Sequence, residues 1–209
     1  MEEKVLYVGI DIAKAKFDVS FTIDGEHCIY YQTIENEKGG FKKLVKEIKK
    51  IQKKFKIKKS HICMEATGIY HCGLCEYLQE HSDLIVSVVH PVQSKSFSKS
   101  HLIRTKNDKI DSMMLAHYAF TNKPKATTKL PENIKKLRIL VRYENSLVKS
   151  LNQEACKLES SIDENEQKLI KQHINFLQEQ QKNVIKQIEE LIKKDEFLNK
   201  QIKLLKTVD

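Results

Sequence analysis

Glycine and proline are scarce in this 209-residue chain and absent from its last part. There are six glycines and three prolines, the last of which are Gly73 and Pro131. Because these residues are the commonest points at which a helix stops, residues 132–209 contain no strong break and are rich in helix formers. The sequence therefore predicts a long helical region at the end of the chain.

The features of an exported or membrane protein are also lacking. No apolar run approaches the roughly 20 residues that cross a bilayer, and residues 1–4 show no signal-peptide pattern. Five cysteines are an odd number, which argues against a complete disulfide framework and fits a reducing compartment. We therefore expect a cytoplasmic protein with no membrane partner.

One cluster of metal-binding residue types could form a zinc site. It contains His61, Cys63, His71, Cys72 and Cys75. No second Cys-x-x-Cys pair accompanies it, and the last two cysteines fall in a helical pattern, where free cysteine commonly packs as a small apolar residue. We therefore favour structural cysteines over a zinc site.

Positive charge is in excess and unevenly placed. The net charge is +9; residues 1–130 carry 22 Lys and Arg against 15 acids, and residues 131–209 carry 15 against 13. A basic module favours a polyanionic partner, although a solvated lysine-rich surface would look similar. Residues 38–59, with eleven lysines and one acid, fit a solvated outer face better than a nucleic-acid-facing patch.

The first part of the chain predicts three antiparallel strands. Residues 4–10 are mostly apolar, and residues 16–23 alternate with period two, which places Phe17 and its apolar partners on one face. Asp24-Gly25 is a strong hairpin signal, and residues 27–34 form the third strand.

Alternating helices and strands follow. After a loop over 36–40 we expect an amphipathic helix that begins near Phe41, then a buried strand over 60–64, a helix over 69–81 and a buried strand over 84–89. Strands that are apolar throughout and separated by helices pair in parallel. Three antiparallel strands followed by such units give an α/β, ribonuclease-H-like mixed sheet with flanking helices.

Two further segments complete the first domain, which we place at residues 1–124. Residues 92–106 read as a polar, basic connection, and residues 107–121 as a helix. A linker over 125–131 leads to the helical region 132–209.

The helical region contains two heptad patterns that are out of phase. A single helix of 78 residues would be about 115 Å long, so we favour two long helices with a polar turn near 163–168. Their apolar seam either joins two copies of the chain in a coiled coil, which we favour, or closes as an intramolecular hairpin on the first domain. The seam residues are Leu151, Ala155, Leu158, Ile162, Leu169, Ile174, Leu177, Val184, Ile188, Leu191, Leu198, Ile202 and Leu205.

Four carboxylates occupy positions suited to a shared site. Asp11 ends the first predicted strand, Glu65 ends the fourth, and Asp108 and Asp111 lie three apart on one helix, where they share a face. If the two strands are neighbours, all four converge. Taken singly, Asp108 could be a helix-start acid, Asp111 an exposed helix residue and Glu65 part of a turn.

Converging carboxylates need cations. Oxygen-only ligands suit Mg²⁺ or Mn²⁺, and two such ions can activate a nucleophile and stabilise the leaving oxygen of a phosphodiester. The pattern therefore predicts nuclease or strand-transfer chemistry.

Four motifs in this order resemble those of the DEDD-type insertion-sequence transposases, which include bridge-RNA-guided recombinases. The motifs are Gly9-Ile10-Asp11-Ile12-Ala13-Lys14, Glu65-Ala66-Thr67-Gly68-Ile69-Tyr70, His90-Pro91 and Thr105-Lys106-Asn107-Asp108-Lys109-Ile110-Asp111-Ser112. Two positions depart mildly from the family pattern, which usually has Thr at position 107 and Ala at position 112.

The resemblance implies a RuvC-like catalytic domain followed by a coiled-coil region, and DNA transposition or recombination as the function. Asp11, Glu65, Asp108 and Asp111 would be the catalytic quartet that binds two Mg²⁺ or Mn²⁺ ions. The partners would be DNA, a structured guide RNA and further copies of the chain, as a dimer or tetramer, in a bacterial or archaeal cell. Candidate nucleic-acid contacts are Lys14, Lys95, Lys99, Arg104, Lys106 and Lys109.

Family members continue into a second, serine-bearing transposase domain, which is expected to begin where this chain reaches Asp209. We therefore expect a shortened form or natural remnant that does not complete recombination alone.

Three other functions stay open. A Holliday-junction-type nuclease of the same fold would use the same quartet, and an RNA-binding, dimerising fragment would bind metal without turnover. A sugar-kinase or actin-like phosphate loop also follows a strand with Gly-x-Asp, but it needs a second glycine-containing loop, and no glycine follows Gly73.

Overall fold

The computed structural model describes residues 4–66, 68–101 and 107–205. Backbone contacts divide the chain into two units, Met1–Lys129 and Leu130–Asp209, which are treated separately below. In the described residues no helix has the length and apolarity needed to cross a membrane.

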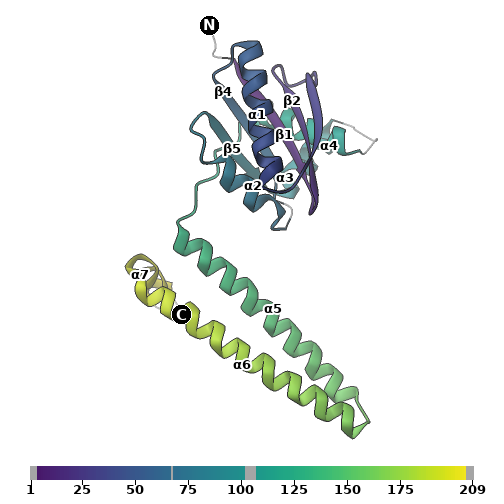
Figure 1. The fold of residues 1–209 in the computed structure, drawn as a ribbon, viewed down its shortest axis with the longest axis vertical. Coiled ribbons are helices and arrows are strands. Elements are labelled where there is room, and N and C mark those ends of the chain that lie inside the picture. The colour runs from purple at the N-terminus through teal and green to yellow at the C-terminus, as the bar shows by residue number, and fades with distance from the viewer. Residues whose placement is uncertain (1–3, 67, 102–106, 206–209) are drawn as a thin grey trace. The chain divides into compact units, whose positions relative to one another are not determined.

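The first unit is built on one five-stranded sheet with the order β3-β2-β1-β4-β5 (Figure 1). The central strand β1 pairs antiparallel with β2 and parallel with β4. This arrangement confirms the predicted ribonuclease-H-like mixed sheet. The strands are β1 Val5–Ile12, β2 Lys16–Thr22, β3 Tyr30–Glu35, β4 Lys59–Glu65 and β5 Leu84–Val89.

Helices cover both faces of the sheet. On one face α1 (Lys38–Phe55) and α2 (Tyr70–Leu78) pack on the main core, and on the other face α4 (Asp108–Asn122) lies across β1, β2 and β4. The short helix α3 (Pro91–Ser100) packs on α4.

Helix α1 begins at Lys38, so most of the loop expected over 36–40 is helical. The first turn lies directly against the end of β3, because a Cβ built on Gly40 would be 1.9 Å from the carbonyl oxygen of Glu35. Glycine at position 40 therefore permits a close approach of helix to strand rather than a loop.

Residues 92–106 were predicted to be an irregular connection, and this prediction was wrong for the first part, which forms helix α3. His90 Nδ1 accepts a hydrogen bond from the Val92 amide, the His90 amide donates to Gln93 Oε1, and Pro91 occupies the first helical position. Caps and proline at a helix start stabilise even a polar sequence as helix. Residues 102–106 lie outside the described residues.

The segment after α4 follows the outer edge of the sheet. The Thr127 amide donates to the carbonyl of Val86 (2.7 Å), and its hydroxyl accepts from the Val88 amide (2.8 Å). The Ser87 hydroxyl reaches the Pro124 and Lys125 carbonyls. The edge of β5 is therefore bonded to the chain itself, which blocks pairing with another strand.

The second unit is a helical hairpin. Helix α5 (Glu132–Ser160) and helix α6 (Glu164–Lys194) lie side by side, joined by three residues, and α7 (Glu196–Leu205) follows. Gln181 bonds Glu144 at 2.9 Å and His173 lies 3.6 Å from Glu154, so the two helices are antiparallel. The turn is shorter than the polar stretch 163–168 that we expected, because Asp163 caps α6.

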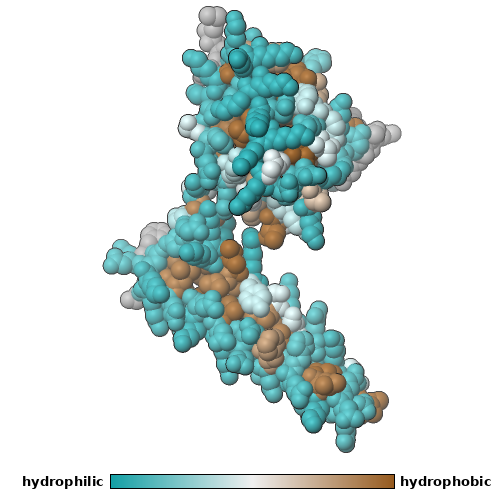
Figure 2. All heavy atoms as spheres, viewed as in Figure 1, coloured by the Kyte–Doolittle hydropathy of each residue, from teal (hydrophilic) through white to brown (hydrophobic). Residues whose placement is uncertain are grey.

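Part of the predicted apolar seam is buried within the chain, where α5 packs on α6. Leu147, Leu177 and Val184 are buried between α5 and α6, and Figure 2 shows apolar residues gathered along the hairpin. Three predicted seam residues were misplaced: Ile162 lies in the turn and is 95% exposed, Leu169 is 66% exposed, and Ala155 is exposed as well.

Candidate active site

Helix α4 lies so close to β1 that the strand needs a glycine. A Cβ built on Gly9 would be 1.9 Å from the carbonyl oxygen of Ser112 and 2.2 Å from the amide nitrogen of Ala116. No side chain fits such a gap. Gly9 therefore sets the distance between the sheet and the helix that carries Asp108 and Asp111.

A polar contact fixes the same helix beside β2. The hydroxyls of Ser20 and Ser112 lie 2.7 Å apart in a buried contact, and the Ser112 hydroxyl also donates to the carbonyl of Lys109 (3.0 Å). The alternating pattern of β2 predicted a polar face, and α4 covers it: Asp18, Ser20 and Thr22 are all buried.

Asp11 and Glu65 lie at the same edge of the sheet. Strands β1 and β4 are parallel, and Ile10 pairs with Met64 directly before the two acids. Asp108 and Asp111 lie in the first turn of α4. Three chain segments thus bring their carboxylates to the carboxyl ends of β1 and β4.

Three of the acids act electrostatically on the fourth, Asp11. The pKa of Asp11 is raised to about 6, first because the side chain is partly buried and then because of the negative charges of Asp111, Asp108 and Glu65, with a smaller effect from Asp18. Like charges in a region of low dielectric constant favour the protonated form of a carboxylate. The edge is therefore a region of concentrated negative charge.

Glu65 and Asp108 are each bonded to a neighbouring side chain. The Ser94 hydroxyl of α3 donates to Glu65 Oε2 (2.5 Å), and the Lys16 ammonium donates to Asp108 Oδ2 (3.3 Å). As the described side chains stand, no three His, Cys, Asp or Glu residues form a group that could hold a metal ion. The four acids share an edge without being gathered around one point.

Three residues near the acids were missed from sequence: Lys16, Asp18 and Ser94. Asp18 is 4% exposed and pairs in register with Asp11 across β1 and β2. Asp18 could have been found from sequence, because it is a carboxylate within the alternating pattern of a predicted strand. Ser94 gave no signal, because its contact with Glu65 depends on the position of α3.

The candidate nucleic-acid contacts fall on several elements. Lys14 lies in the turn between β1 and β2, Lys95 and Lys99 lie on α3, and Lys109 lies on α4; all four are exposed. Arg104 and Lys106 lie outside the described residues.

The cysteines do not assemble into a zinc site. Cys63 packs on the α4 side of the sheet and Cys75 in the core on the α1 side, so they are on opposite faces. Burial raises the pKa of the Cys63 thiol to about 12, which disfavours the thiolate that zinc requires. His61 bonds Ser87 instead (2.8 Å).

Comparison with known proteins adds the family. The sequence model of the DEDD transposases of the IS110 type, described as transposase, matches residues 8–167. The chain belongs to this transposase family. The match includes Asp11, Glu65, Asp108 and Asp111, and it extends through α5 into the start of α6.

Individual relatives of this transposase family member are the pilin gene-inverting proteins of Moraxella bovis and Moraxella lacunata. Each is 31% identical over 156 residues, which is 74% of this chain and 46% of the relative. The chain thus spans about half the length of the curated relatives it matches. Among solved structures, Thermus thermophilus RuvC, alone and with a Holliday junction, aligns with a TM-score of 0.41 and 11% identity over 58% of this chain and 99% of RuvC.

Proposed function

We propose that this chain carries the divalent-metal site with which a DNA transposase or recombinase cleaves or transfers phosphodiester strands. The observation that supports this most is the shared electrostatics of the acidic edge, where Asp111, Asp108 and Glu65 all act on a partly buried Asp11. Carboxylates that repel one another bind cations favourably, because each cation relieves the repulsion.

The donor set suits Mg²⁺ or Mn²⁺. Asp11, Glu65, Asp108 and Asp111 offer only carboxylate oxygens, which hard divalent cations prefer, and four such acids would be enough to hold two ions. When bound, such a pair supplies an activated nucleophile and stabilises the leaving oxygen.

The protein's own residues position these ligands. Ser94 orients Glu65 by donating to one carboxylate oxygen, and the contacts of α4 with Gly9 and Ser20 hold its first turn at the acidic edge. Because Asp108 is bonded to Lys16, its carboxylate has to share or leave that ammonium when it takes up a cation.

DNA is the proposed substrate, and a structured guide RNA is the proposed second partner in a bacterial or archaeal cytoplasm. Lys14, Lys95, Lys99 and Lys109 are exposed and would contact phosphates. Contacts of this kind release condensed counterions and give salt-sensitive binding. The guide RNA rests on the family resemblance of the motifs.

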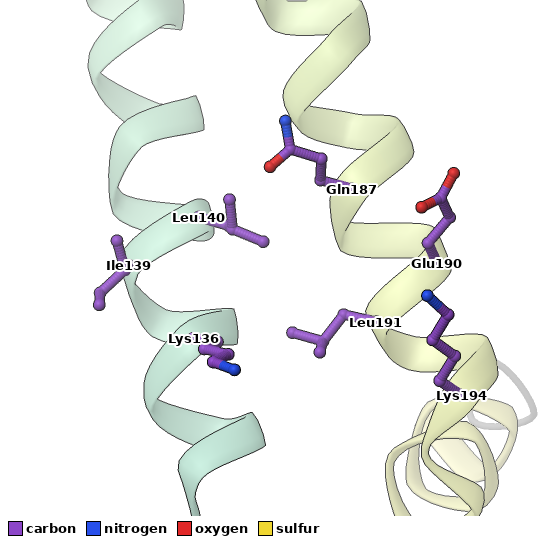
Figure 3. A pocket seen from close by; sticks show the side chains of 7 residues that line it. All are labelled: Lys136, Ile139, Leu140, Gln187, Glu190, Leu191 and Lys194. Atoms are coloured by element: carbon purple, nitrogen blue, oxygen red, sulfur yellow. The ribbon is translucent and has the colours of Figure 1, made fainter.

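A homo-oligomer is proposed through the helical hairpin. Figure 3 shows a groove between α5 and α6 in which Leu140 and Leu191 point toward one another, while Ile139 points away from α6. Ile139 is 64% exposed, Phe176 is 56% exposed and Ile185 is 41% exposed. A second hairpin that covered these side chains would remove apolar surface from water.

Strand cleavage in Mg²⁺ tests the proposal. We expect Asp11→Asn and Asp111→Asn to lose cleavage of element-end DNA by at least about 100-fold. Asp163→Asn is the matched control, since it removes one acid and keeps a good helix cap for α6. Undiminished cleavage by Asp11→Asn would contradict the proposal.

A nucleic-acid-binding platform without turnover is the second candidate. It is favoured by the absence, among the described side chains, of three metal-ligating residues in one group. Salt-sensitive binding of RNA or DNA without any cleavage in Mg²⁺ or Mn²⁺ would select it over the first.

A further inference from the structure

Asp18 is a buried carboxylate outside the proposed quartet. It is 4% exposed on β2, and its Oδ1 accepts hydrogen bonds from the Tyr31 hydroxyl and the Thr33 hydroxyl, each at 2.5 Å. Taking a carboxylate out of water is costly unless hydrogen bonds and an opposite charge compensate for it. With two donors from β3 on one oxygen, the side chain is held in a fixed place.

The opposite charge comes from Lys16. Its ammonium lies 3.8 Å from Asp18 Oδ2 and 3.3 Å from Asp108 Oδ2. The side chain is nevertheless 52% exposed, which leaves the ammonium accessible from solvent.

The surroundings of Lys16 are concave and contain charges of both signs, including two further lysines. An open groove beside it is lined by Lys14, Thr33 and Asn36, together with Glu35 and Glu37. The ammonium of Lys109 lies 5.7 Å from the centre of the Tyr31 ring, and the hydroxyl of that tyrosine holds Asp18. Two lysines from β2 and α4 thus flank one anchored tyrosine and carboxylate.

We propose that Asp18 positions Lys16 as a phosphate-binding residue beside the acidic edge, where it contacts the backbone of the bound nucleic acid. This inference rests on the proposed function, because it needs a nucleic acid at that edge. Carboxylates repel phosphates, so a strand that approaches Asp108 requires a cation next to it. The ammonium of Lys16 lies there, 3.3 Å from Asp108 Oδ2.

The chemistry of lysine permits this role. An ammonium has three donors, and Asp18 and Asp108 occupy at most two of them. A phosphate oxygen can take the third, or the one freed when Asp108 takes up a cation. Because Asp18 is fixed by β3, Lys16 loses less conformational freedom on binding than an untethered surface lysine.

Salt-dependent binding tests the inference. The probe is a 30-base-pair DNA duplex, titrated in EDTA at several KCl concentrations so that no strand cleavage interferes. We expect Lys16→Met to reduce the slope of log K against log salt by about 0.9, the value for one lost phosphate contact on duplex DNA. Lys16→Arg keeps the charge and should keep the slope.

Two further variants separate this role from general effects. Lys157→Met is the matched control, because Lys157 is a 63% exposed lysine paired with the mostly buried Glu154 in the helical unit. It should leave the slope unchanged. Asp18→Asn removes the carboxylate that anchors Lys16 but keeps the lysine. The affinity of this variant for the duplex should therefore fall below that of Lys16→Arg. Its thermal unfolding midpoint verifies that the variant is folded.

The outcomes distinguish this inference from the function on which it rests. Equal slopes for Lys16→Met, Lys157→Met and the unchanged protein would overturn the role of Lys16 and leave the metal site untouched. Strand cleavage that does not depend on a divalent metal ion would contradict the proposed function but not the role of Lys16. If the protein without substitutions does not bind the duplex, both the proposed function and the role of Lys16 are contradicted.

Discussion

Ser20 Oγ and Ser112 Oγ lie 2.7 Å apart in a contact from which solvent is fully excluded. The contact joins β2 to α4 one turn after Asp108, so it helps to decide where the acidic first turn of the helix lies. Position 112 is also where the family usually has alanine. The serine at this position has a buried partner, which explains how the sequence accommodates the departure.

A double-mutant cycle should detect the serine pair. We expect Ser20→Ala and Ser112→Ala each to lower the free energy of unfolding by about 1–2 kcal/mol, because each leaves a buried hydroxyl with fewer partners. The double variant should lose less free energy of unfolding than the two single variants lose together, with a coupling free energy of about 1 kcal/mol measured in urea. Strictly additive values would mean that the two hydroxyls do not interact.

Gly9 and Gly73 should respond oppositely to alanine. At Gly9 a methyl group would meet the backbone of α4, so Gly9→Ala should lower the free energy of unfolding by about 3 kcal/mol or more. At Gly73, inside α2, the nearest atom is 3.6 Å away on the Phe41 ring. Gly73→Ala should therefore be neutral or stabilise by about 0.5–1 kcal/mol through helix propensity, as measured in urea. A mild effect at Gly9 would indicate that α4 shifts freely.

The raised pKa of Asp11 should appear in the pH dependence of stability without metal. Folded protein keeps the Asp11 proton up to about pH 6, whereas the unfolded chain releases it near 3.8, so this residue makes stability fall as pH rises between those values. Asp11→Asn should remove that fall. After allowance for solvent screening at this partly exposed group, we expect its melting temperature in EDTA at pH 7 to exceed that of the unchanged protein by about 2–4 °C.

The two proteins should converge near about pH 3, where Asp11 is mostly protonated in both states. Parallel melting curves across pH 4–7 would contradict the electrostatic coupling of the four acids.

Two leucines of α6 provide a matched pair for the hairpin. Leu177 is 7% exposed in the seam and Leu169 is 66% exposed. Leu177→Ala should destabilise the helical unit by about 2–3 kcal/mol through lost burial and a cavity, and Leu169→Ala should change it by less than about 0.5 kcal/mol. Circular dichroism during urea unfolding of the helical signal would measure both. A large effect of Leu169→Ala would indicate that a partner covers this face.

Local sequence patterns predicted most of the elements in their order along the chain. Period-two alternation, apolar strands and the Asp24-Gly25 turn predicted the strands, and the absence of glycine and proline predicted the helical end. Helix α3 was missed because its stability comes from the cap at His90 and from packing of Phe97 against His117 and Tyr118. A polar decapeptide carries little of that information.

By itself the sequence determined which segments form the strands and which side chains share a face, because both follow from backbone periodicity. It could not determine what covers each face. Only the tertiary structure decided that α4 buries the polar side of β2, that Lys16 lies between Asp18 and Asp108, and that the seam closes between α5 and α6. Lys16 and Asp108 are 92 positions apart, and contacts over such separations depend on the packing of whole elements.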